Sequence, residues 1–522
     1  MTSNRYSPMD NPSSPVSHLP PELLVRVFGY LTICSSPTIL LKTCRRWADI
    51  ASSVSSLWCR IDFSTPPAPL LQRCASRPIE VILPSSPTIP TSNQLNAAKG
   101  VLLLYSDRIR KLVLDLPAGQ LRRFEAELSG AFPILADVSI SVKLNHYTHL
   151  PFDDFPEWTP TAIPFSPIRY LRLLLVKSPW VPGRFQNLVE FFLHDQWCSD
   201  FDPSMEIFLG ILESSPQLTI LSVANAGPRL PLGTTTLPPA TRVVHLHNLQ
   251  HLYIEQQDAC DVGWMLIHLK ISISVNVRIF VDLDSTGQSA VPPELVVDLA
   301  LPNHPGFPHL TNLRRCTYVA YILPSCVVAA PNFAFNVSWD AVMHTHFDNF
   351  MIPFLRRAMA AGVIEDLTVI HERPDERKIS IFQWDQLFST LHSLKKLRVQ
   401  QIWGGPDPTI WALFESLPST ALRDLSVCPL VFGKGPQGEE EEWNRKELTE
   451  RLVNWCAERH RRGCRLNRLV IEDLMYPPPD LTSLLAPYVD HFEIGKVGSG
   501  DGDIWGIKFG SRHVFDHLRV CR

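Results

Sequence analysis

Long apolar runs are missing from this chain of 522 residues. A membrane-spanning helix needs about 20 mostly apolar residues, and the nearest segment, Tyr318 to Phe335, is interrupted by Pro324 and Pro331. The first residues, Met1 to Pro15, are polar and rich in Ser and Pro, without the apolar core of a signal peptide. We therefore expect no contact with a membrane, and a location in the cytoplasm, the nucleus or both.

A concentration of charge of one sign is also missing. The chain has 48 Lys and Arg against 52 Asp and Glu, which gives a net charge of -4. No segment gathers the basic residues into the stripe that nucleic-acid binders carry. Nucleic acid is therefore not an expected partner.

Motifs for metal binding and catalysis are absent as well. The 12 Cys form no C-x-x-C pair, and neither Gly-x-Ser-x-Gly nor His-Glu-x-x-His occurs. His245, His247 and His251 flank one expected strand without a matching Cys or carboxylate set, which favours surface histidines. The spaced glycines of 498–502 precede an expected strand, as in a hairpin turn. We expect no metal, no cofactor, no catalytic residue and no enzymatic activity.

Length and proline content point to many short elements. A single core rarely grows beyond about 250 to 300 residues, so this chain holds several domains or one elongated repeat array. The 46 Pro are scattered along the whole chain, and proline ends helices and cannot donate to a strand ladder. The pattern favours a repeat array over a bundle of long helices.

Three short helices are expected near the start, after a flexible leader over 1–15. His18 to Leu31 begins with two prolines that suit a first helical turn. Helical spacing puts Leu24, Phe28 and Leu31 on one face and Leu23, Val27 and Tyr30 on a second apolar stripe, so one stripe can pack inside and the other needs a partner. A second helix is expected from Ser36-Pro37, with Leu40, Cys44, Trp47 and Ala51 on one face. Val54, Leu57 and Trp58 form a third piece, before a strand through Ile61 and Phe63.

The order of these residues resembles the F-box motif over 16–64. The resemblance rests on Leu19-Pro20-x-Glu22-Leu23, Val27-Phe28-x-x-Leu31, Cys44-Arg45-Arg46-Trp47 and Leu57-Trp58. It implies a three-helix fold that binds the Skp adaptor of an SCF-type ubiquitin ligase and, through the adaptor, a cullin. The residues that it assigns to adaptor binding are Leu19, Pro20, Leu23, Val27, Phe28, Leu31, Cys44, Trp47 and Trp58. Two departures stand out: no acidic residue lies between Thr32 and Ser36, and Thr43 stands where the family usually has Val.

The rest of the chain repeats one apolar pattern, L-x-x-L-x-L with Ile, Val or Phe allowed. Successive starts lie 20 to 33 residues apart in the first half and 23 to 44 in the second. The eleven matches begin at Ile109, Leu135, Ile168, Leu188, Leu218, Leu249, Ile364, Leu394, Leu422, Leu466 and Val489. The pattern resembles leucine-rich repeats, in which each unit stacks on its neighbours because it cannot bury its own apolar face.

We therefore expect an α/β fold: a three-helix F-box, then an irregular leucine-rich-repeat-like solenoid over 65–520 with a parallel sheet on its concave side. Helices are expected at Met205 to Ser214, Trp384 to His392, Ile410 to Leu417 and Glu447 to Arg461. Residues 255–363 break the pattern, with alternating strands at Val277 to Leu283 and Phe333 to Trp339 and an insertion at Asp284 to Pro308. Gly433 to Glu442 is expected to be a surface loop.

An F-box followed by drifting leucine-rich repeats resembles a large group of proteins from mushroom-forming fungi. The segment Leu71 to Leu83 adds to that resemblance, because it looks like the strand that follows the F-box in that group. The implied role is the substrate-recognition subunit of the ligase, with the repeat array holding an unknown target protein. The alternative is a repeat scaffold whose F-box only caps the array or acts outside a ubiquitin ligase.

Overall fold

The structure is a computed structural model, and the chain divides into two compact units. The first comprises residues 1–280 and 299–307, and the second comprises residues 281–298 and 308–522. The residues described are 18–34, 37–83, 90–124, 132–142, 168–178, 180–181, 183, 185–195, 203–231, 234, 236–256, 258–283, 300–301, 308–309, 315–320, 325–330, 333–339, 364–371, 391, 393–401, 421–428, 440–472 and 480–495. The expected boundaries at 15, 64 and 520 stay predictions.

The first unit opens with short helices. These are α1 (Pro21–Cys34), the 3-10 turn η2 (Pro37–Ile39), α2 (Leu40–Thr43), α3 (Arg45–Ser53) and the 3-10 turn η3 (Ser55–Trp58). We call residues 18–58 the N-terminal module.

A sheet of parallel strands follows the module in the first unit. Its strands pair in the order β1 (Arg60–Ile61), β2 (Ile79–Leu83), β3 (Ile109–Leu116), β4 (Asp137–Val142), β5 (Tyr170–Leu174), β6 (Glu190–His194), β7 (Ile220–Ala224) and β9 (His251–Gln256). β8 (Val244–His245) and β10 (Leu269–Lys270) form a separate parallel pair, and β11 (Asn276–Leu283) pairs with β9. Consecutive strands are neighbours, as expected when each repeat stacks on the one before it.

Two rows of buried side chains run across this sheet. The fourth motif position forms one row, in which Leu112, Val138, Leu171, Phe191, Leu221 and Leu252 pair in sequence. The sixth position forms the other, through Leu114, Ile140, Leu173, Leu193, Val223 and Ile254. All twelve side chains are buried. Burial of each contributes on the order of 1.5 to 3 kcal/mol, so the repeated pattern is the core of the unit.

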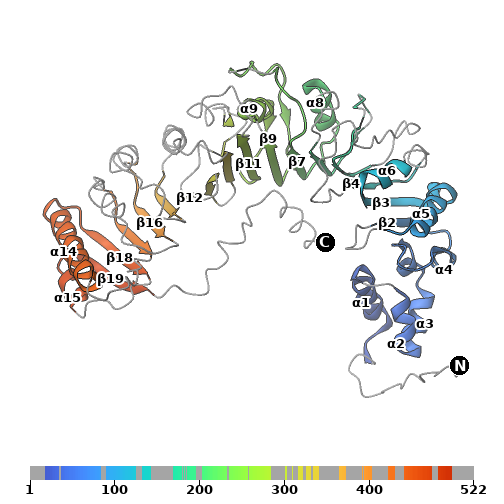
Figure 1. Ribbon diagram of the computed structural model, residues 1–522, viewed down its shortest axis with the longest axis horizontal. Coiled ribbons are helices and arrows are strands. Elements are labelled where there is room, and N and C mark those ends of the chain that lie inside the picture. The colour runs from blue at the N-terminus through green and yellow to red at the C-terminus, as the bar shows by residue number, and fades with distance from the viewer. Residues whose placement is uncertain are drawn as a thin grey trace. The chain divides into compact units, whose positions relative to one another are not determined.

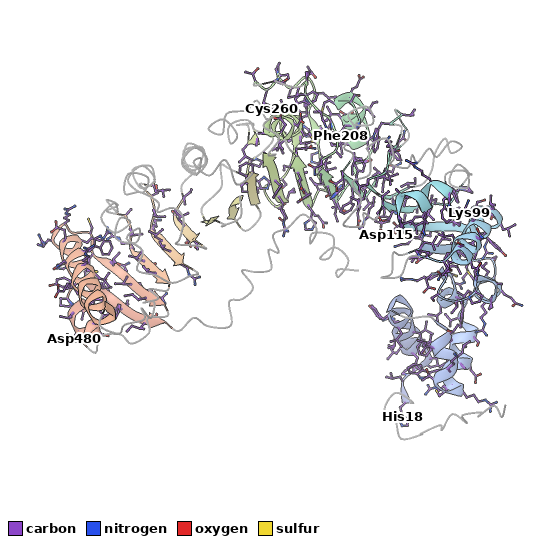
Figure 2. All side chains as sticks on the ribbon, in the orientation of Figure 1. His18, Lys99, Asp115, Phe208, Cys260 and Asp480 are labelled. Atoms are coloured by element: carbon purple, nitrogen blue, oxygen red, sulfur yellow. The ribbon has the colours of Figure 1, made fainter. Side chains whose placement is uncertain are left out.

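Helices pack on one face of this sheet (Figure 1). They include α4 (Pro67–Cys74), α5 (Ser92–Leu104), α6 (Ala118–Leu121), α8 (Met205–Glu213) and α9 (Ala259–Ile267). Phe208 of α8, labelled in Figure 2, packs on Phe191 of β6 with ring centroids 6.4 Å apart. The helix expected over Met205 to Ser214 is confirmed.

Side chains at the helix starts define where these helices begin. Thr91 and Gln94 form a capping box before α5. Ser204 accepts a hydrogen bond from the amide of Ile207 before α8, and Asp258 accepts one from Cys260 before α9. Each cap satisfies an amide that the first helical turn leaves without a partner, which stabilises a helix by about 1 kcal/mol.

The second unit repeats the parallel arrangement. β15 (Asp366–His371), β16 (Lys396–Gln401), β17 (Asp424–Cys428), β18 (Leu466–Glu472) and β19 (Val489–Gly495) pair in sequence. Their motif residues again align, with Leu367, Leu397, Leu425, Leu469 and Phe492 in one row. Helices α14 (Glu440–Arg461) and α15 (Leu481–Leu485) belong to this unit.

The irregular region departs from a parallel sheet. β12 (Arg315–Ala320), β13 (Ser325–Ala330) and β14 (Phe333–Trp339) are joined as antiparallel pairs, while β12 also lies parallel to β15. The reason is chain length: four residues separate β12 from β13 and two separate β13 from β14, whereas a parallel crossover needs a dozen or more. The alternating strands expected over 277–283 and 333–339 are confirmed.

Three other expectations concern helices and loops of the second half. The helix over Glu447 to Arg461 is confirmed but begins earlier, at Glu440, within the segment expected to be a loop. The helices at 384–392 and 410–417 fall largely or wholly outside the described residues. The same holds for most of the 284–308 insertion and for the glycines of 498–502.

Leu221→Ala should destabilise the first unit far more than Ile220→Ala on the same strand. Leu221 is buried in the row described above, whereas Ile220 points to the opposite face and is only half-buried. A buried Leu→Ala exchange typically costs 2 to 5 kcal/mol because it leaves a cavity, so about that loss is expected. Urea unfolding followed by circular dichroism measures both variants, and equal losses would contradict the assignment of the two faces.

Candidate functional site

Helix α1 separates a buried stripe from an exposed one. Leu24 and Phe28 are fully buried, while Leu23, Val27 and Leu31 are 40 to 45% exposed and Tyr30 is 75% exposed. Leu31 is exposed, although helical spacing puts it on the face of Leu24 and Phe28. Leu31 lies four residues after Val27 and so extends the exposed stripe, which we call the α1 stripe (Leu23, Val27, Tyr30 and Leu31).

Phe28 anchors α1 on the rest of the module. Its ring lies 4.8 Å from that of Trp47 on α3, at a tilted angle of 55°. Aromatic pairs in this geometry contribute about 0.5 to 1.5 kcal/mol beyond the burial of their area. Phe28 therefore supports the α1 stripe from behind, and its direct contact with an adaptor stays a prediction.

The second expected helix is interrupted. Cys44 has extended backbone angles (φ -158°, ψ 165°), which end α2 at Thr43 and let α3 begin at Arg45. Leu40 and Ala51 are buried, while Cys44 and Trp47 are only partly covered. The expectation of one continuous helix through Cys44 was wrong. The break gives α3 a direction of its own, so Trp47 can meet Phe28.

Two polar contacts tie the remaining predicted residues to the module. Arg46 Nη2 donates to the carbonyl oxygen of Leu19 at 2.6 Å and holds the segment before α1. Trp58 Nε1 donates to the carbonyl oxygen of Ala51 at 2.7 Å. Trp58 is buried, so any direct contact with an adaptor also stays a prediction, whereas Leu19 is half-buried and Pro20 is exposed.

Only Cys59 separates the module from β1, the first strand of the sheet. Arg73 of α4 lies 4.4 Å above the Trp58 ring, a cation–π contact, and β1 pairs with β2 directly after the module. Gln94 of α5 donates to the carbonyl oxygen of Phe63 at 3.1 Å. Phe63 has φ 59° and follows β1, so the strand expected through Phe63 ends at Ile61. The cation–π contact fixes the module against α4, and the other two contacts fix the segment after the module against β2 and α5.

A second candidate surface is the sheet face opposite the helices, which we call the second face. In the first unit, neighbouring strands place opposite charges together there, as Lys111 with Asp137 at 2.8 Å and Arg172 with Glu190 at 2.8 Å. The Arg172 guanidinium also lies 4.5 Å above the Phe192 ring. In the second unit, Arg468 pairs with Glu493 at 2.7 Å. The pattern L-x-x-L-x-L locates these positions, because they alternate with the buried ones.

Part of the second face is closed to solvent near β6 and β7. His194 is buried, and its Nε2 lies 2.7 Å from Ser222 Oγ. Desolvation, followed by the repulsion of Arg172, lowers the pKa of His194 to about 3, so the imidazole stays neutral at physiological pH. Burial raises the pKa of Asp195, although a hydrogen bond from Asn225 opposes that shift. These groups stabilise the strand ends.

Other motif residues do not assemble into a site among the residues described. No group of three or more His, Cys, Asp or Glu side chains in that part of the chain is placed to hold a metal ion. His245, His247 and His251 are exposed. Within the same residues, no helix has the length and apolar character to cross a bilayer.

The N-terminal module matches a known protein family. Residues 16–64 match the family described as F-box-like, so this segment is an F-box-like domain. The match covers the residues on which the resemblance was based, from Leu19 to Trp58. No curated protein matches the chain with significant sequence similarity.

Among solved structures, the chain is similar to the crystal structure of a TLR13-ssRNA13 complex. The alignment has 13% identity and a TM-score of 0.30, and it covers 80% of this chain and 47% of that chain. The chain thus spans about half the length of that protein. A similarity at this level carries no conclusion about fold or function.

Phe28→Ala should loosen the N-terminal module, whereas Tyr30→Ala should leave it intact. Phe28 is fully buried against Trp47, and Tyr30 is 75% exposed on the same helix. Truncation of a buried Phe typically costs 3 to 5 kcal/mol, and truncation of an exposed residue changes stability by less than about 0.5 kcal/mol. Limited proteolysis with mass mapping of cuts within 18–58 measures the difference. Equal protection in both variants would refute the described packing.

Proposed function

We propose that this chain is the substrate-recognition subunit of an SCF-type ubiquitin ligase, which binds a Skp-type adaptor through the α1 stripe. The observation that carries the proposal is an exposed row of four large apolar side chains on an F-box-like domain whose core is already closed by Leu24 and Phe28. Such a row exposes apolar area to water, so it favours a partner that covers it.

The two sheets support the second half of the proposal. Rows of aligned motif residues in both units are typical of leucine-rich repeats, and we interpret 65–520 as such an array. The second face offers partly exposed charged side chains, such as Lys111 and Arg172 with 26 and 21% of their side chains exposed, for contact with a target protein. Since repeat sheets present extended surfaces, a folded protein or a long peptide fits better than a small molecule.

In this role the chain carries out no chemistry itself. It would hold the target near the ubiquitin carrier of the ligase, which raises the effective concentration of the target lysine. The contacts that join the module to α4, and the segment after it to β2 and α5, favour this mechanism, because a firm connection limits the positions that a bound target can take. The place of action would be the cytoplasm, the nucleus or both.

The double variant Leu23→Asp/Val27→Asp should lose adaptor binding. Two charges placed in an apolar interface, and two lost contacts of about 2 kcal/mol each, predict a fall of at least about 100-fold in affinity. The matched control is Leu103→Asp/Leu104→Asp on α5, where the two side chains are 65 and 76% exposed outside the domain. Calorimetric titration of the full chain with a purified Skp adaptor measures all three proteins, with circular dichroism to verify folding.

Binding by the wild type and the α5 control, but not by the α1 variant, is the expected result. No binding by any of the three would overturn the proposal. Binding that survives the α1 change would move the adaptor contact to another surface.

An experiment with a cullin distinguishes the ubiquitin-ligase proposal from the scaffold alternative. Addition of a cullin to the adaptor complex should give a three-protein assembly on size-exclusion chromatography. Adaptor binding without cullin recruitment would instead favour a repeat scaffold that acts outside a ubiquitin ligase.

A further inference from the structure

Two cysteines meet where the N-terminal module joins the sheet. Cys59 follows η3, and Cys74 is the last residue of α4. The Cys59 thiol donates to the carbonyl oxygen of Ser55 at 3.3 Å, and it lies close enough to Cys74 to interact with that sulfur. Both residues are buried, with 9 and 0% of their surfaces exposed, and neither is in a disulfide.

A guanidinium faces this pair. Arg108 Nη2 donates to Cys74 Sγ at 3.6 Å and to the carbonyl oxygen of Arg77 at 2.9 Å, which holds the positive charge at the sulfur. The hydrogen bond from Cys59 and then the charge of Arg108 lower the pKa of Cys74 to about 7, against the opposing effect of burial. The same contact raises the pKa of Cys59. The Arg108 guanidinium thus favours the thiolate on Cys74, the sulfur that it contacts.

We propose that Cys59 and Cys74 are a redox modification site, at which hydrogen peroxide converts the two thiols into a reversible disulfide. The site has the arrangement that redox-sensitive cysteines need: a sulfur held next to a cation, with a second thiol in contact to resolve it. Because both sulfurs are buried, a small oxidant such as peroxide suits the site, whereas bulky disulfides do not.

The chemistry proceeds in two steps. The Cys74 thiolate attacks one peroxide oxygen, the O–O bond breaks, and hydroxide leaves with the bonding electron pair and is protonated to water. The resulting sulfenic acid on Cys74 is then attacked by the sulfur of Cys59, and the S–O bond breaks. The departing hydroxide takes the proton of Cys59 as water. In total, two thiols and one peroxide give one disulfide and two waters, with two electrons passing from sulfur to oxygen.

The bond would join two elements that now contact each other without a covalent link. Cys59 adjoins Trp58, and Cys74 adjoins Arg73, the partners of the cation–π contact between η3 and α4. A disulfide at this point would hold the F-box-like domain to the start of the sheet. The chemistry needs no adaptor, so the inference stands or falls independently of the proposed function.

Peptide mapping of the intact chain tests the site. The folded protein is treated with hydrogen peroxide, its free thiols are alkylated, and it is digested with trypsin. Trypsin cuts after Arg60 and after Arg73, so the two cysteines fall on separate peptides that only a disulfide joins. The expected product is the Cys59–Cys74 linked pair, two hydrogen atoms lighter than the sum of its peptides, and a reducing agent should restore both thiols.

Cys260, labelled in Figure 2, is the internal control. It is equally buried, but its neighbours are the carboxylates of Asp258 and Asp261, and burial together with those charges raises its pKa to about 12. It should stay alkylatable after the protein is unfolded, at peroxide doses that link Cys59 to Cys74. Oxidation of Cys260 at the same rate, or no linked pair at any dose that oxidises the half-exposed Cys44, would overturn the proposal.

Variants with a single substitution test which cysteine is oxidised by peroxide and which one then attacks the sulfenic acid. In Cys59→Ser, the reaction should stop at the Cys74 sulfenic acid, which dimedone traps, and in Cys74→Ser, Cys59 should stay reduced. Arg108→Gln should slow the formation of the pair at least several-fold at neutral pH, since the guanidinium no longer stabilises the thiolate. Trapping on Cys59 in place of Cys74 would contradict the assignment. Where a variant fails to fold by circular dichroism, the mapping of the wild-type chain alone decides the proposal.

Discussion

Each strand of the two sheets aligns its buried side chains with those of the next parallel strand, and the rest of the architecture depends on that alignment. The row through Leu171, Phe191 and Leu221 shows the constraint, because no single repeat could bury these residues alone. A slip of one residue between two strands would turn every side chain to the other face. The register is therefore strongly specified, although the spacing between repeats varies. Insertions are tolerated because they extend the connections and leave the strands unchanged.

An exposed apolar stripe can persist on α1 because other side chains close the core of the module and attach it to the rest of the unit. The module closes its own core through Phe28 and Trp47, and it is held to the sheet by Trp58, Arg73 and the pairing of β1 with β2. Neither set of contacts needs the side chains of the α1 stripe. Leu23 and Val27 can thus be committed to a partner at little cost to the stability of the chain. A domain that used the stripe for its own packing would have to open before it could bind.

Much of this fold follows from the sequence because the repeated pattern reports burial directly. The pattern located the parallel strands from β3 to β9 and from β15 to β19, and the order Leu19 to Trp58 located the F-box-like domain. Helical periodicity alone did not show that Leu31 is exposed, since two stripes that nearly encircle a short helix do not reveal which one faces inward. The break at Cys44 depends on how α3 docks, and the proximity of Cys59 and Cys74 depends on tertiary structure. Neither has a local sequence signal.

The charges on the second face limit how a target could be recognised there. Lys111 with Asp137 and Arg172 with Glu190 neutralise each other within the sheet, so these four residues add no net charge that would steer a partner from a distance. Partly exposed pairs of this kind contribute only about 0 to 1 kcal/mol each, and their partners can therefore be exchanged at small cost. Recognition would then rest on short-range fit, with the exchangeable charges supplying selectivity. On this argument, binding of a target to the second face should depend weakly on salt, in contrast to a surface that attracts its partner through one sign of charge.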